Sequence, residues 1–170
     1  MKSLPDGGTI GVAALASPYD MRSELERGVE WWEARGYRVK LAPGVHDRDD
    51  YVAGDAQRRA DDLHALFADP EVDVVQALQG GFGSSEMLPH LDFDLIARYP
   101  KPFVGYSDIT SLHVPIRQRA GFRLTGSRWR REAKWRPALR RSWDGEASPG
   151  VNRRRAKLLF RVPANPMAAP

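Results

Sequence analysis

Short apolar runs alternate with amphipathic segments along the first 121 residues of the chain. An apolar run too short for a helix predicts a buried strand, and apolar residues recurring every three or four positions predict a helix. The runs that predict strands are residues 9–15, 37–41, 72–78 and 102–106. The segments that predict helices are residues 21–32, 55–67, 91–98 and 108–121.

Four alternations of strand and helix predict an α/β fold. Such a pattern forms a mostly parallel sheet with right-handed crossovers and flanking helices. Sheets of this kind place their functional sites at the carboxyl ends of the strands. Two predicted strand ends carry unusual residues, namely the glycine-rich segment Gly80–Ser84 and the pair Ser107 and Asp108.

Composition narrows the class of protein. The chain has 170 residues, of which 42% are hydrophobic and 28% charged, which is typical of a soluble globular protein. The absence of cysteine excludes disulfides, thiolate zinc sites and cysteine nucleophiles. No run of 18 apolar residues predicts a membrane span, and the N-terminus lacks the apolar core of a secretory signal. We therefore expect a cytoplasmic protein.

The net charge of +4 hides two different kinds of sequence. Residues 1–126 hold 14 Lys and Arg against 19 Asp and Glu, a net charge of −5. Residues 127–170 hold 12 against three, a net charge of +9, and their apolar residues follow no steady period. We expect an α/β domain over residues 1–124 and a basic tail rich in Arg, Trp and Pro, with irregular structure, over residues 125–170.

The two strand ends predict acyl-transfer chemistry or simple turns. Ser107 lies at a strand-to-helix turn, where a sharp bend would lift its hydroxyl above the sheet as in the nucleophile elbow of hydrolases. The backbone amides of Asp108 and of the Gly80–Gly83 turn could then bind an oxyanion. The alternative is structural, because Ser-Asp before a helix is often an N-cap and glycine after a strand is often a tight turn.

Longer segments resemble the N-terminal domain of the LD-carboxypeptidase family of serine peptidases. The resemblance runs from about Gly11 to Gly121, through residues 16–18, 25–28, 53–55, 58–64, 67–73, 80–82, 88–93 and 100–110. It implies a Rossmann-like layer of the flavodoxin or glutamine-amidotransferase type. It also implies a Ser-His-Glu triad with Ser107 as nucleophile, and no metal or cofactor.

The resemblance further implies an oxyanion hole and a substrate class. The oxyanion donors would be the backbone amides of Gly81 and Asp108, and Gly80, Phe82 and Ser84 would contact the substrate. Family members cleave the terminal D-alanine from L,D-linked murein tetrapeptides, or a microcin-like peptide nucleotide. Gln79 stands where murein enzymes usually carry Arg, and the segment 83–88 together with Tyr106 favours the microcin-immunity-like branch. Homodimers are implied as well.

The resemblance stops near Leu124. The family would continue with a Thr-aromatic-His-Gly-Pro-Met-like segment, whereas this chain reads Thr-Gly-Ser-Arg-Trp over residues 125–129. Two hypotheses account for the change, an out-of-frame reading of a GC-rich gene and a genuine C-terminal extension. The resemblance implies that the triad Glu and His come from a C-terminal domain, and we expect this sequence to lack that domain.

No local histidine replaces the missing base. His113 lies six residues after Ser107 on the same predicted helix, about 9 Å along its axis and too far for a direct hydrogen bond. His46, His64 and His90 have no evident partner in the sequence. We therefore expect this chain to be inactive or nearly so, because a serine hydroxyl without its base is a poor nucleophile.

Two other functions remain open at this point. The domain could bind a peptide ligand without turnover. The tail could bind nucleic acid, because its arginines are interleaved with Trp129 and Trp135, which could stack on bases. We favour the view that an out-of-frame reading produced the tail's composition, which makes nucleic-acid binding the weaker alternative.

Overall fold

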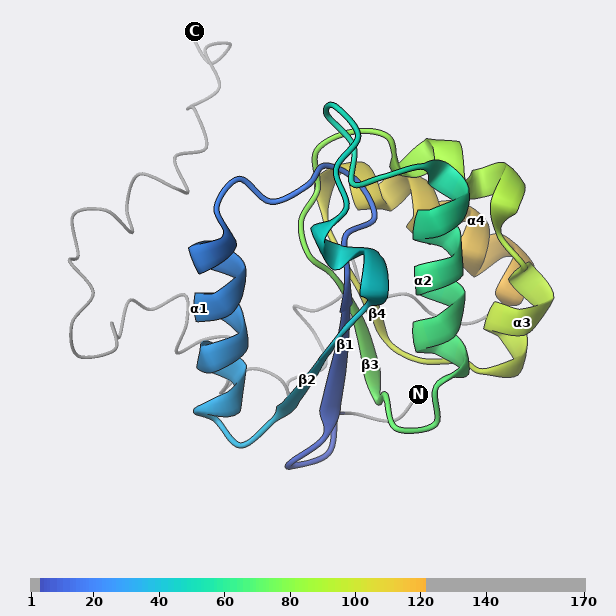
Figure 1. Cartoon of the computed structure of the whole chain (residues 1–170). Helices are drawn as coiled ribbons and strands as arrows, with labels where there is room; N and C mark the ends of the chain where they lie inside the picture. The colour runs from blue at the N-terminus through green and yellow to red at the C-terminus, as the bar shows by residue number, and fades with distance from the viewer. Residues whose placement is uncertain (1–3, 122–170) are drawn as a thin grey trace, which may run out of the picture. The chain divides into compact units, whose positions relative to one another are not determined.

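A computed structural model describes residues 4–121, and its centre is a four-stranded parallel sheet (Figure 1). The strands are β1 (Thr9–Ala13), β2 (Arg38–Leu41), β3 (Val74–Ala77) and β4 (Phe103–Val104), arranged in the order β2-β1-β3-β4. The register pairs Ile10 with Val39 on one side and with Val74 on the other. All five residues of the central strand β1 are buried, as its uninterrupted apolar sequence predicts.

Helices cover both faces of this sheet (Figure 1). Helix α1 (Arg22–Glu33) lies on one side, and α2 (Ala56–Ala68), α3 (Phe93–Arg98) and α4 (Thr110–Ala120) lie on the other. The main hydrophobic core fills the second layer, where Leu63 and Phe67 of α2 meet Phe103 of β4 and Ile116 of α4. The α/β class and the parallel sheet predicted from the sequence are confirmed.

The chain reverses its direction of winding at β1. It reaches β2 through α1 on one side of the sheet and then β3 through α2 on the opposite side. Sheets with this order bind ligands at the switch point between β1 and β3, outside the carboxyl ends of the strands. The loops that follow β1 and β3 both lie at the upper edge of the sheet in Figure 1.

Three short 3-10 helices complete the described part of the chain. They are η1 (Pro43–His46), η2 (Ser84–His90) and η3 (Ser107–Ile109). The sequence indicated only a polar loop for residues 43–54 and gave no element for residues 84–90. The predicted tail, residues 125–170, lies outside the described residues. No helix within residues 4–121 is long and apolar enough to cross a membrane.

Candidate active site

Three strand-end loops meet at the carboxyl edge of the sheet, because β1, β3 and β4 are neighbours in it. Ser17, after β1, donates its backbone N–H to the carbonyl of Gly80 at 3.3 Å. Its hydroxyl accepts the backbone N–H of Phe82 at 3.2 Å, and Gln79 donates to the carbonyl of Pro18 at 2.6 Å. The glycine turn after β3 is therefore tied to the loop after β1.

The glycine turn also touches the loop after β4. A Cβ placed on Gly80 would lie 3.1 Å from the Cβ of Ser107 and 3.5 Å from its Oγ. A Cβ on Gly81 would lie well inside contact distance of the Ser17 side chain, and Gly81 has a φ of +119°. Glycine is required at Gly81, since a side chain there would collide with Ser17 and strain the backbone, whereas a side chain at Gly80 would need Ser107 to shift by a few tenths of an ångström.

Ser107 has a backbone conformation that serine rarely adopts. Its φ is +56°, in the left-handed region that non-glycine residues rarely adopt. Gly105 makes the turn tight, because a Cβ there would lie only 2.4 Å from Cγ2 of Ile109. The Ser107 side chain is exposed. A strained serine between a strand and a helix is the arrangement that presents a nucleophile above a sheet.

The two backbone amides predicted as oxyanion donors are unpaired within the described residues, and their role stays a prediction. Within residues 4–121, neither the N–H of Gly81 nor that of Asp108 has a hydrogen-bond partner. The Asp108 amide stands in the first turn of η3, which continues directly into α4. Unpaired N–H groups at a helix start favour a nearby negative charge. The Phe82 amide is not available in the same way, since Ser17 occupies it.

The predicted substrate-contacting residues differ in exposure. Phe82 is 68% exposed at the edge of the site, whereas Gly80 is buried. Ser84 is fully buried, and its hydroxyl hydrogen-bonds the Asp108 carbonyl and the Ser111 hydroxyl. The assignment of Gly80, Phe82 and Ser84 to substrate binding stays a prediction.

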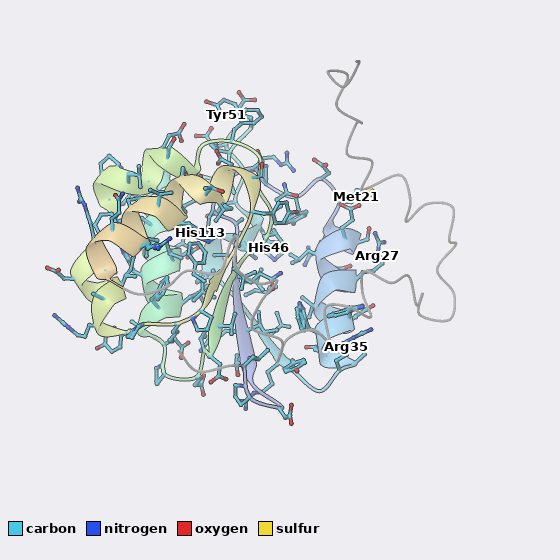
Figure 2. The ribbon with its side chains drawn as sticks, turned by 180° about the vertical axis from the view of Figure 1, so that it is seen from behind. Met21, Arg27, Arg35, His46, Tyr51 and His113 are labelled. Carbon is cyan, nitrogen blue, oxygen red and sulfur yellow. The ribbon has the colours of Figure 1, made fainter. Side chains whose placement is uncertain are left out.

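No histidine hydrogen-bonds Ser107 within the described residues, which include all four histidines of the sequence. His113 packs edge-on against the Phe103 ring at 4.8 Å, on the side of the sheet that carries α2, α3 and α4 (Figure 2). Burial lowers the pKa of the His113 imidazole, and its Nε2 has no partner within residues 4–121.

Two of the other histidines form hydrogen bonds with residues other than Ser107. His64 accepts the backbone N–H of Asp92 at 2.9 Å, and burial lowers its pKa. His46 hydrogen-bonds the hydroxyl of Tyr19. Neither of these histidines hydrogen-bonds Ser107, and the hydrogen bonds within residues 4–121 supply no general base for it.

Arg59 supports the site in a way that the sequence interpretation missed. Its side chain is 1% exposed and donates to the carbonyl of Leu15 at 3.3 Å, to that of Gly83 at 2.9 Å, and to Glu86 at 2.8 Å. It thus links the end of β1 to the end of the glycine turn. A signal was present, because Arg59 lies four residues before Leu63 on the apolar face of α2.

Comparisons with known proteins agree with this geometry. Residues 10–126 match the LD-carboxypeptidase N-terminal domain family. A Bacillus subtilis protein named "Probable murein peptide carboxypeptidase" is 42% identical over 120 residues, which are 71% of this chain and 37% of that protein. The Escherichia coli microcin C7 self-immunity protein MccF is 31% identical over 117 residues, which are 68% of this chain and 34% of that protein.

Solved structures show the same relationship. The MccF structure without ligand superposes with a TM-score of 0.68 at 30% identity, covering 71% of this chain and 37% of MccF. A muramoyltetrapeptide carboxypeptidase from Oxalobacter formigenes superposes with a TM-score of 0.59 at 30% identity, covering 64% of this chain and 36% of that enzyme. The chain belongs to the LD-carboxypeptidase family and spans little more than a third of the length of these relatives.

Proposed function

We propose that this domain carries the nucleophile of a serine-type LD-carboxypeptidase. The observation that supports the proposal most is Ser107, held at a φ of +56° against Gly80 of the glycine turn, with the amides of Gly81 and Asp108 unpartnered within residues 4–121. A nucleophile and two oxyanion donors are the parts that acyl transfer needs from one side of a scissile amide. Family membership favours the same chemistry.

The reaction would proceed through an acyl-enzyme. The Ser107 hydroxyl attacks the amide carbonyl while a base outside residues 4–121 takes its proton. The backbone amides of Gly81 and Asp108 stabilise the negative oxygen of the tetrahedral intermediate. The carbon–nitrogen bond then breaks, the leaving amine takes the proton from the base, and water releases the acyl group from Ser107.

Two substrate classes follow from the named relatives. One is a murein-derived peptide that ends in an L,D-linked D-alanine, as in murein tetrapeptide carboxypeptidases. The other is a peptide nucleotide of the microcin type, represented by the aspartyl sulfamoyl adenosine bound to MccF in one structure. We propose that this domain, together with a part that supplies the base, hydrolyses one of these two, and that the 170-residue chain alone does not turn over either.

A chimera tests the proposal. Residues 10–126 would replace the matching segment of the B. subtilis relative, so that the rest of that protein supplies the base. We expect release of D-alanine from the murein tetrapeptide, or cleavage of aspartyl sulfamoyl adenosine, measured by mass spectrometry. Ser107→Ala should lower kcat by a factor of about 10⁶, as removal of a catalytic serine does.

The control variant is Ser85→Ala, which changes an exposed serine two residues beyond the glycine turn. It should keep the activity of the unaltered chimera. If Ser107→Ala kept full activity, Ser107 would not be the nucleophile. If a folded chimera bound either compound without cleaving it, the alternative of a ligand-binding domain would be favoured instead.

A further inference from the structure

Ser84 connects the two halves of the candidate oxyanion hole. It is fully buried and opens η2 directly after the glycine turn. Its backbone N–H donates to Oδ2 of Asp108 at 2.9 Å, and its hydroxyl donates to the Asp108 carbonyl at 2.8 Å. The hydroxyl also lies 2.6 Å from Oγ of Ser111. Every one of these bonds reaches the segment that carries the nucleophile.

The site needs such a connection because its two donors stand on different loops. Gly81 belongs to the loop after β3, and Asp108 belongs to the loop after β4. Oxyanion donors are effective only when both lie within about 2.7–3.1 Å of the developing charge. Glycine gives a turn little conformational preference of its own, so side chains elsewhere have to fix it. Gly83, the residue before Ser84, has a φ of +88°.

The N–H and hydroxyl groups of Ser84 both form hydrogen bonds within the protein. A serine hydroxyl has one proton to donate, which goes to the Asp108 carbonyl, and it can accept the Ser111 proton. The Asp108 carboxylate is engaged as well, since it accepts the Ser84 N–H at the start of η2. The Ser84 hydroxyl is therefore buried and bonded within the protein, rather than presented to a substrate.

We propose that Ser84 is a positioning residue, which holds the Gly80–Gly83 turn in place against the Ser107–Asp108 elbow. The effect of Ser84 on catalysis rests on the function proposed above, whereas its structural role in holding the turn does not depend on that function. Loss of the hydroxyl should loosen the elbow locally and leave the centre of the sheet unchanged, because its partners Asp108 and Ser111 both lie in the segment 107–120.

Amide hydrogen exchange on the 170-residue chain tests the positioning without any activity. The reporter is the Ile109 amide, which donates to the Tyr106 carbonyl within the elbow at 3.2 Å. The reference is the Val75 amide, which donates to the Pro102 carbonyl between β3 and β4 at 2.9 Å. Ser84→Ala should speed exchange of Ile109 about tenfold relative to Val75, as the loss of one to two net hydrogen bonds predicts.

Matched variants make the outcome decisive. Ser85→Ala should leave both rates unchanged, and Ser111→Ala, which removes only one partner of Ser84, should speed exchange of Ile109 by a smaller factor. If Ile109 does not respond in Ser84→Ala, or if Ile109 and Val75 accelerate equally, Ser84 is not a positioning residue. If Ser84→Ala does not fold, the same comparison of Ile109 with Val75 in Ser111→Ala decides the question.

The chimera separates this inference from the proposed function. In it, Ser84→Ala should lower kcat about 10- to 100-fold with KM unchanged, because misplaced donors weaken only the transition state. An inactive wild-type chimera would overturn the proposed function while the exchange result still stood. Local loosening with an unchanged kcat would show that Ser84 positions the elbow without consequence for the oxyanion, which would overturn the catalytic part of the inference.

Discussion

Gly105→Ala should destabilise the protein through a single steric contact. The new Cβ would lie 2.4 Å from Cγ2 and 2.9 Å from Cβ of Ile109, more than 1 Å inside ordinary carbon contact for the first of these. Ile109 is fully buried, so it cannot move aside into solvent. Overpacking of this kind costs about 1–3 kcal/mol. Because Gly105 leads directly into the elbow, the backbone shift should also displace Ser107.

A second glycine provides the matched control. Gly28 lies inside α1, where an added Cβ would meet no atom within 4 Å, and its φ is not positive. Alanine there should stabilise the protein by about 0.4–1 kcal/mol, since it restricts the unfolded chain and favours the helix. The same chemical change is thus expected to have opposite signs at residues 28 and 105.

Urea denaturation followed by circular dichroism measures both effects. A double-mutant cycle with Ile109→Ala tests the contact with Cγ2, because that change removes Cγ2, keeps Cβ and costs about 2–5 kcal/mol by itself. The Gly105→Ala penalty should shrink by about 1 kcal/mol or more in the Ile109→Ala background. Equal stability of Gly105→Ala and wild type, or additivity of the pair within about 0.5 kcal/mol, would refute the reasoning.

Two further predictions concern buried ionisable side chains. Arg59→Ala should lower the free energy of unfolding by about 3 kcal/mol or more in urea denaturation, because it leaves the Gly83 carbonyl without its donor and opens a cavity. The control is Arg58→Ala, at a half-exposed neighbour, which should lower it by less than about 1 kcal/mol. Burial lowers the pKa of His113 and of His64 below the unfolded value near 6.5. The unfolded state therefore binds more protons than the folded state just below this pH, and the free energy of unfolding should fall as the pH drops below about 6.5. His113→Phe should reduce this fall in the free energy of unfolding between pH 7.5 and 5.5. An unchanged fall would contradict the lowered pKa of His113.

The regular elements were predictable because burial dictates their patterns. Strand β1 is buried on both faces and therefore apolar throughout, and α2 has an apolar stripe behind an Asp55 cap that accepts the Arg58 amide. The 3-10 helix η2 was not predictable, since a short segment containing Pro89 has neither strand nor helix periodicity. Strand β4 is shorter than expected because only Phe103 and Val104 pair with β3, while Tyr106 stays extended without a partner strand before the turn at Ser107.

The sequence predicted where the candidate site lies on the sheet, but not the backbone conformation and contacts of its residues. Ser107 and the glycine turn follow strand ends, which is enough to bring them to one edge of a parallel sheet. The left-handed φ of Ser107 occurs where Gly105 packs closely on Ile109, and the buried Ser84 is bonded to Asp108, 24 residues away. Such contacts arise only when the elements pack, so residue type and spacing along the chain do not reveal them.

The conformation of Ser107 has a consequence for anyone who engineers this domain for heat resistance. A left-handed backbone costs a non-glycine residue roughly 1–2 kcal/mol, and glycine would relieve that cost. A library screened only for survival at high temperature would therefore enrich glycine at position 107 and discard the candidate nucleophile among its first gains. Codon 107 should be held constant in any such library, and selection should act on the rest of the domain.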